Sequence, residues 1–181
     1  AFGSGAKIAA NATSSVGLGS GAQATKSNSV SLGFTSNATG TSSTAIGSTA
    51  NASGNLSTAI GGTSTAAGDR GVVIGYGAKG STSLDLLAIG YNANATGNGA
   101  FAGGASSSAN GNNALALGTS SNAIGPKTVA IGGDSKSTSD FATAIGNSAN
   151  ANALYSTAIG GNSSANAVTA NAAGAIAIGS N

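Results

Sequence analysis

The chain has 181 residues, among them 31 glycines but no cysteine or histidine, and its six basic and four acidic residues give a net charge of +2. This composition excludes disulfides and thiolate metal sites, and the few scattered charges exclude a nucleic-acid-binding surface, which needs clustered Lys and Arg. Large apolar residues are too few for a thick core, and no apolar run approaches the ~20 residues of a membrane span.

One short pattern recurs along the whole chain. The pentapeptide STAIG stands at residues 43–47, 57–61 and 156–160, and relaxed copies of it also end on a glycine. These terminal glycines are Gly19, Gly33, Gly47, Gly61, Gly75, Gly90, Gly104, Gly118, Gly132, Gly146, Gly160 and Gly179. They lie 14 residues apart, except for steps of 15 before Gly90 and 19 before Gly179. A fixed period of this kind predicts a solenoid in which each copy is one turn.

Each copy ends in a short strand, which we number from its terminal glycine as position 0. Positions −3 and −1 carry Val, Leu, Ile or Thr in nearly every copy, and this alternation predicts a strand. Position −2 carries small, uncharged residues, so we expect both faces of the strand to be buried. The alanines of this trimer or core face are Ala45, Ala59, Ala88, Ala116, Ala130, Ala144 and Ala158.

Two orientations of this strand remain open. The preferred one turns the large aliphatic side chains into the roll and exposes the small residues at position −2. A contiguous row of small apolar residues marks an interaction site, so another copy of the chain would cover it. The reversed orientation places Ala inside and Ile and Val toward the partner. In both, one face of the strand needs a partner.

A second strand follows each terminal glycine. Ala or Ser at positions +3 and +5, with a polar residue between them, predicts a strand buried on one face, from Ala22/Ala24 to Ser163/Ala165. A second row of glycines at +7 suits a tight turn: Gly40, Gly54, Gly68, Gly97, Gly111 and Gly125. The sequence therefore predicts an all-β parallel β-roll, one domain over residues 1–181, with one extra residue in 81–86 and a longer loop at 166–174.

Aromatic and hydroxyl side chains also recur in register. Tyr76 and Tyr91 share position +1 and are expected to stack, and Phe141 and Tyr155 share position −5. We interpret these rings first as packing that protects the turns, and alternatively Tyr76, Tyr91 and Tyr155 as exposed contacts for a ligand. A row of serines at position −4 is expected to form mutual hydrogen bonds: Ser15, Ser29, Ser43 and Ser57.

The nonapeptide NSVSLGFTS at residues 28–36 resembles the N-S-V-A-I-G-x-x-S motif of YadA-like head domains of trimeric autotransporter adhesins. Residues 113–121 and 155–163 resemble it as well. The first copy departs by Ser31 in place of Ala, and most other copies lack the leading Asn. The resemblance covers essentially the whole chain and implies a left-handed parallel β-roll that assembles as a homotrimer. Through it, the candidate ligand-binding residues are Asn28, Ser29, Val30, Leu32, Gly33 and Ser36.

The same resemblance implies an exported virulence factor on the outer-membrane surface of a Gram-negative bacterium. Its partners would be extracellular-matrix proteins such as collagen, fibronectin or laminin, host cells, or abiotic surfaces. The family's neck, coiled-coil stalk and membrane anchor have no counterpart in this sequence, and we interpret the chain as a fragment of a longer protein.

Catalysis is not expected, because the sequence has no His, Cys or Glu and its four Asp are scattered among turns. No metal or cofactor is expected either. Two other functions remain open. Besides the adhesin, the alternatives are a passive spacer in a surface fibre and an ice-binding solenoid. The ice-binding hypothesis is disfavoured because Thr44 and Thr58 alternate with aliphatic residues at position −3, which is typical of a core row.

Overall fold

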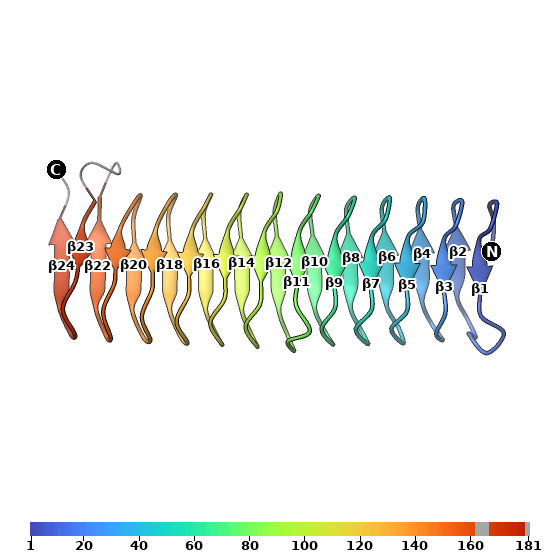
Figure 1. Cartoon of the computed structure of the whole chain (residues 1–181), viewed down its shortest axis with the longest axis horizontal. Helices are drawn as coiled ribbons and strands as arrows, with labels where there is room; N and C mark the ends of the chain where they lie inside the picture. The colour runs from blue at the N-terminus through green and yellow to red at the C-terminus, as the bar shows by residue number, and fades with distance from the viewer. Residues whose placement is uncertain (162–166, 180–181) are drawn as a thin grey trace. The chain divides into compact units, whose positions relative to one another are not determined.

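A computed structural model describes residues 1–161 and 167–179, and these residues form short β-strands joined by turns (Figure 1). Within these ranges no helix is long and apolar enough to cross a membrane. The chain divides into two compact units, Ala1–Asn92 and Ala93–Asn181, which we describe separately. The interpretation of residues 1–181 as one domain stays a prediction.

Each unit contains two parallel sheets. In the first unit, the even-numbered strands form the first sheet: β2 (Val16–Leu18), β4 (Val30–Leu32), β6 (Thr44–Ile46), β8 (Thr58–Ile60), β10 (Val72–Ile74) and β12 (Leu87–Ile89). The odd-numbered strands form the second sheet: β1 (Lys7–Ile8), β3 (Gln23–Ala24), β5 (Asn37–Ala38), β7 (Asn51–Ala52), β9 (Thr65–Ala66) and β11 (Lys79–Gly80).

The second unit repeats this arrangement. Its first sheet contains β14 (Phe101–Gly103), β16 (Leu115–Leu117), β18 (Val129–Ile131), β20 (Thr143–Ile145), β22 (Thr157–Gly160) and β24 (Ile176–Gly179). Its second sheet contains β13 (Asn94–Ala95), β15 (Ser108–Ala109), β17 (Asn122–Ala123), β19 (Lys136–Ser137), β21 (Asn150–Ala151) and β23 (Thr169–Ala170).

The strand register follows the sequence period. Thr44 pairs with Thr58 and Ile46 with Ile60, so equivalent residues of successive copies lie side by side in parallel strands. The predicted all-β solenoid, with two strands in each 14-residue turn, is confirmed. The one extra residue lies where it was expected, because Lys79 still pairs with Thr65 whereas Leu87 pairs with Val72.

The longer loop was placed too far along the chain. Thr169 and Ala170 form β23 in register with Asn150 and Ala151, so residues 166–174 are not one loop. Ile145 pairs with Ile159, and the next strands pair Asn150 with Thr169, so the five additional residues lie between Ile159 and Thr169. The expected strand residues Ser163 and Ala165, like residue 166, lie outside the described residues. Val168 and Ala170 occupy the strand positions, +3 and +5, that were assigned from the sequence to Ser163 and Ala165.

The core of each turn consists of small side chains. Ala45 and Ala59, at position −2, are fully buried within the single chain, as are Ala50 and Ala52 of the second strand. The preferred orientation of the first strand is therefore wrong, and the reversed one is observed. The physical reason is the tight turn at each end, which holds the two strands of a turn close together. Alanine and serine side chains fill the interior, and the longer aliphatic side chains point outward.

One site shows what a larger interior side chain requires. Among the described residues, Val73 at position −2 and Leu86 at position −4 are the two largest fully buried side chains. Gly80 stands where most copies have Ala, and a Cβ there would lie 2.4 Å from Cδ1 of Leu86 and 2.9 Å from Cγ2 of Val73. The missing side chain makes room for the two large ones, as expected for an interior packed at close to crystal density.

Interior hydroxyls close the turns. Ser43 Oγ donates to the carbonyl of Gly40 at 2.7 Å, and Ser57 Oγ donates to that of Gly54 at 2.6 Å. The expected mutual bonding along the serine row is observed only between Ser29 and Ser15, at 3.4 Å. The prediction is wrong for Ser43 and Ser57, because each hydroxyl finds the glycine carbonyl three residues earlier within its own turn.

Candidate interaction surfaces

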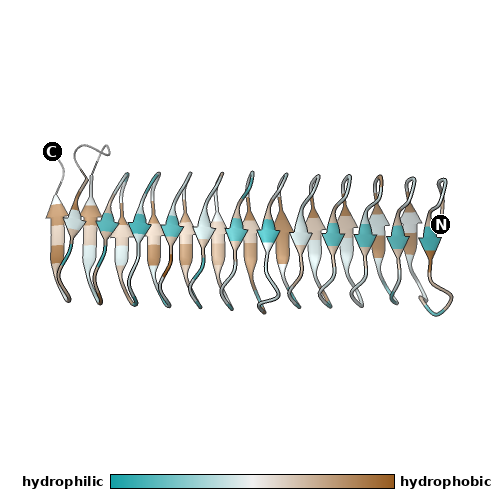
Figure 2. Cartoon of the chain, viewed as in Figure 1, coloured by the Kyte–Doolittle hydropathy of each residue, from teal (hydrophilic) through white to brown (hydrophobic). Residues whose placement is uncertain are grey.

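The outer face of the first sheet carries rows of aliphatic side chains, which we call the aliphatic face. It consists of positions −3 and −1 of the even-numbered strands, where Ile46 lies beside Ile60 and Ile60 beside Ile74. Ile74 and Ile89 are 37% and 40% exposed in the single chain. Most first-sheet strands are correspondingly hydrophobic in Figure 2, whereas most second-sheet strands are hydrophilic. Within each unit, this face is a contiguous apolar surface.

The aliphatic face has one copy in which its residue pattern breaks. In β14 the usual aliphatic residue at position −1 is Gly103. A Cβ there would lie 2.7 Å from Cδ2 of Leu117 and 3.2 Å from Cε2 of Phe101. The larger Phe101 ring and the neighbouring Leu117 thus occupy the space of the missing side chain.

The threonines of position −3 belong to this outer face. Thr44 and Thr58 are half-buried in the single chain and point away from the interior, as the first-sheet burial pattern shows. The interpretation of this row as core is therefore wrong, because the core-facing position of the strand is −2. The argument that disfavoured an ice-binding solenoid no longer holds in that form.

The residues matching the nonapeptide motif do not share one surface. Ser29 and Ser36 are fully buried, and Ser36 Oγ donates to the carbonyl of Gly33 at 3.0 Å. The interpretation of these two serines as ligand-binding residues is wrong, because a ligand cannot reach them while the turn is folded. Val30 and Leu32 lie on the aliphatic face.

The other two motif residues shape the turns. Asn28 is exposed and has a φ of 59°, in the left-handed region that Asn tolerates well. Gly33 has a φ of 137°, and a Cβ there would lie 2.7 Å from the carbonyl carbon of Gly47. The interior hydroxyl of Ser31, where the motif has Ala, is bonded to Ser36 Oγ at 2.7 Å. The motif therefore encodes the fold of a turn more than a binding site.

Exposed aromatic rings stack at the turns, and the expected pair of Tyr76 and Tyr91 is among them. The rings of Tyr76 and Tyr91 have centroids 5.9 Å apart and planes 9° from parallel. Phe141 and Tyr155 stack at 5.0 Å and 23°, and Lys127 Nζ lies 5.2 Å from the Phe141 centroid. All four rings remain accessible to a ligand.

One exposed ion pair joins two neighbouring turns. Arg70 Nη2 donates to Asp85 Oδ2 at 2.8 Å, and Arg70 Nε donates to the other carboxylate oxygen. The hydrogen bond from Arg70 lowers the pKa of Asp85 below its ordinary value. The same bond raises the pKa of Arg70. Such exposed pairs contribute little to stability.

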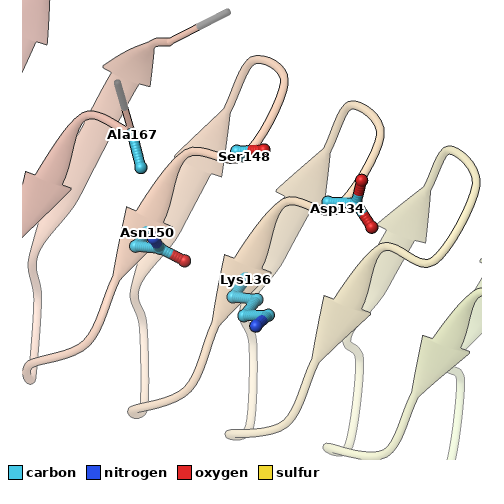
Figure 3. Close-up of a pocket in the computed structure, with 5 residues that line it drawn as sticks. All are labelled: Asp134, Lys136, Ser148, Asn150 and Ala167. Carbon is cyan, nitrogen blue, oxygen red and sulfur yellow. The ribbon is translucent and has the colours of Figure 1, made fainter. Parts of the chain in front are cut away.

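A shallow polar groove crosses the second unit. Asp134, Lys136, Ser148, Asn150 and Ala167 line it, and Figure 3 shows these side chains on successive turns of the chain. Within the described residues, no three His, Cys, Asp or Glu side chains cluster as a metal site would require. One carboxylate and one amine without such neighbours make neither a metal site nor an acid–base pair, so we assign no chemistry to this groove.

A comparison with known protein families identifies this repeat. The YadA head domain repeat, in its two-copy form, matches residues 10–36, 38–55, 52–78, 87–107, 109–135, 123–149 and 137–163. The chain belongs to the YadA head family. A comparison with curated proteins gave no match. Heads of the YadA family are typically exposed on the surface as part of autotransporter adhesins.

The YadA head repeats account for the unusual composition of the chain. Each match falls on the strand-and-turn units described above, so the repeated small residues and glycines belong to the fold. The residues that vary from one 14-residue repeat to the next are the outward residues of the turns and of the second sheet. The buried small side chains were identified from the sequence, but their location inside the single chain was only the less favoured of two orientations. The signal that could have favoured it is the pairing of the large Val73 and Leu86 with Gly80, which lacks a side chain.

Proposed function

We propose that the chain is the head of a trimeric autotransporter adhesin that attaches a bacterium to other surfaces without catalysing a reaction. Its partners in this proposal are extracellular-matrix proteins such as collagen, fibronectin or laminin, host cells, or abiotic surfaces. The observation that carries the proposal is the aliphatic face, combined with membership of the YadA head family. The head is displayed at the outer membrane, and segments outside this sequence supply the anchor.

The aliphatic face supports association of identical chains. Parallel sheets are normally covered on both faces, and the inner face of the first sheet is already covered by the second sheet. Burying a half-exposed Ile such as Ile74 or Ile89 contributes roughly 1 kcal/mol, and the residues recur at every turn. A closed ring of three copies covers each aliphatic face with two others and leaves none exposed. The trimer axis therefore faces positions −3 and −1.

Adhesion in this proposal comes from the surfaces that a trimer leaves free. These are the outward polar residues of the second sheet and the turn tips. Three chains with many similar turns give high avidity from weak individual contacts. No single residue is then expected to account for attachment.

The proposal is tested by binding of the purified chain to immobilised collagen, fibronectin and laminin and to polystyrene. We expect saturable binding to at least one of these surfaces, weakened when the assembly is dissociated by Ile60→Asp on the aliphatic face. Thr65→Asp, on the outward face of the second sheet, is the matched control for added charge. Absence of binding to all four surfaces would support the passive spacer instead.

The same preparation tests the ice-binding alternative. A trimer buries the rows of Thr and Ile that an ice plane would need, so we expect no thermal hysteresis. A measurable hysteresis from a monomeric chain would reverse the assignment of this face.

A further inference from the structure

A second surface lies at the turn that follows each first-sheet strand. Position +1 of this turn carries Phe34, Tyr76 and Tyr91 in the first unit, and these rings are 60%, 59% and 57% exposed. The chain has only four Phe and three Tyr, so three of its seven large rings fall at one position of one turn type. We call this row of position +1 residues the aromatic column.

The backbone holds the aromatic column in register. The amide of Thr49 donates to the carbonyl of Phe34 at 2.8 Å, and the amide of Asn92 donates to the carbonyl of Tyr76 at 2.9 Å. The rings of Tyr76 and Tyr91 are close to parallel, as described above. Each ring is therefore presented by a rigid turn and not by a free loop.

Small residues separate the two ends of the column. Ser48 and Gly62 occupy position +1 between Phe34 and Tyr76. A Cβ at Gly62 would lie 3.2 Å from Cδ2 of Tyr76, so the Tyr76 ring lies against this glycine and no side chain stands between them. With parallel strands ~4.8 Å apart, the three turns from Phe34 to Tyr76 span about 14 Å. The column thus carries an aromatic ring at each end of this stretch and only small residues between them.

The rim of the column, at position +2, is polar and uncharged. Position +2 carries Thr35, Thr49 and Thr63, and all three side chains are exposed. No charged residue stands at positions +1 or +2 of the turns that begin at Gly33, Gly47, Gly61, Gly75 and Gly90. The surface combines ring surfaces with hydroxyls at the spacing of one turn.

We propose that the aromatic column binds a neutral carbohydrate chain. The C–H face of a pyranose ring packs on the Tyr76 or Phe34 side chain, and its hydroxyls exchange hydrogen bonds with Thr49 and Thr63. This deepens the proposed adhesin function and rests on it, because it names the chemical class of one surface partner.

A carbohydrate fits this surface better than a protein partner does. Aromatic hot spots in protein interfaces lie in desolvated pockets surrounded by further contacts, whereas these rings stand on exposed turn tips. A charged ligand would find no counter-charge at the rim. Sugar rings have an apolar face and a hydroxylated edge, which matches alternating rings and threonines, and one turn rise of ~4.8 Å is close to the length of one pyranose unit.

Saturation-transfer NMR on the purified chain tests this site, with cellohexaose, maltohexaose and chitohexaose as probes. We expect transfer to at least one probe, and affinity about tenfold weaker for Tyr76→Ala, the size of a lost aromatic contact. Tyr76→Phe keeps the ring and is expected to keep most of the affinity. Leu56→Ala is the matched control, because Leu56 is also 59% exposed but is aliphatic and lies at the opposite turn.

Three results would overturn the proposal. The first is no transfer to any of the three probes from the unmodified chain. The second is an equal loss of binding in Leu56→Ala, which would indicate an unspecific apolar effect. The third is a fall in the solution mass of Tyr76→Ala, which would identify the rings as contacts between subunits. Binding to matrix proteins is measured separately, so its presence without carbohydrate binding refutes this site alone.

Discussion

Replacing one terminal glycine tests the account of how the turns stack. Gly47 has a φ of 130°, in a region that residues with a side chain rarely adopt. A Cβ at this position would lie 2.7 Å from both the carbonyl carbon and the oxygen of Gly61 in the next turn. The obstacle is backbone, so it cannot rotate away as a side chain would. Gly47→Ala must therefore shift one turn against its neighbour.

The expected cost has two parts. The unfavourable φ contributes about 1–3 kcal/mol. Separating the turns weakens two hydrogen bonds beside the clash, from the amide of Gly61 to Ile46 at 2.8 Å and from that of Thr63 to Ser48 at 2.9 Å. At about 1 kcal/mol for each bond, the total loss is roughly 3–5 kcal/mol, a large share of the stability of an ordinary domain.

Urea unfolding followed by far-ultraviolet circular dichroism measures this loss, with two matched glycines in the same unit. Gly5 has a φ of 67° but no atom closer than 4.0 Å to an added Cβ, so Gly5→Ala is expected to cost only about 1 kcal/mol. Gly17 stands at position −2 without a positive φ, and an added Cβ would make ordinary contacts of 3.5–3.8 Å. Gly17→Ala is therefore expected to stabilise the chain by about 0.5–1 kcal/mol.

The order of the three changes in the free energy of unfolding tests this description of the stacked turns. If Gly47→Ala costs no more than Gly5→Ala, the close stacking of the turns is not a source of stability. If Gly17→Ala destabilises the chain by more than about 1 kcal/mol, the interior at position −2 is more tightly filled than described.

The remaining predictions concern a strained turn, the exposed ion pair and the aliphatic face. Thr49 is β-branched and has a φ of 56°, so Thr49→Asn should raise the free energy of unfolding by about 1 kcal/mol in the same urea assay, and a decrease would contradict the assigned strain. Because Arg70 lowers the pKa of Asp85, the pair stabilises the fold above the ordinary carboxyl value of 3.8, and this contribution is lost as the pH falls through the lower folded value. Asp85→Asn should accordingly unfold with a shallower acid-side pH dependence, and an unchanged profile would show that the pair contributes nothing. Ile60→Asp should dissociate the assembly while Thr65→Asp leaves it intact, as measured by sedimentation velocity, and equal effects would exclude a specific role for the aliphatic face.

Much of the fold was predictable because a repeat imposes its register. Once Ser43–Gly47 and its copies set a period of 14, equivalent residues had to stack, and the parallel pairing of Thr44 with Thr58 followed. The stacking of Tyr76 on Tyr91 was predictable for the same reason. These conclusions depend only on the period and not on which way a side chain points.

The direction of each strand face was not predictable from alternation alone. Positions −2 and −3 are both free of charge, so either side could be interior by composition. The separation of the two strands within a turn decides it, and that distance depends on the two tight turns. The sequence did contain one indication of the interior face. Gly80 lacks a side chain where Val73 and Leu86 are unusually large, and side chains that compensate one another in volume must face one another.

The position of the insertion was ambiguous for a different reason. Residues near 163–175 repeat Asn, Ala and Ser so closely that several registers fit the pattern. Only the pairing of Thr169 with Asn150 selects one of them. Low complexity therefore limits what periodicity can locate.

The candidate site was less predictable than the fold. Exposure of Tyr76, Tyr91 and Tyr155 followed from their place at the turns. The motif residues Ser29 and Ser36 were misassigned because a recurring motif suggested a ligand. In a solenoid, a motif that recurs at every turn is more often required for stacking, and a site is found where a turn departs from its neighbours.

The mass of the purified chain in solution tests the central claim, that the aliphatic face of the first sheet is an interface between identical chains. Light scattering at micromolar concentration should give three times the 16.5 kDa of one chain, and Ile60→Asp should give the mass of the single chain. A stable, soluble monomer of the unmodified chain would contradict the claim, because its rows of Ile, Leu and Val would then remain exposed to water.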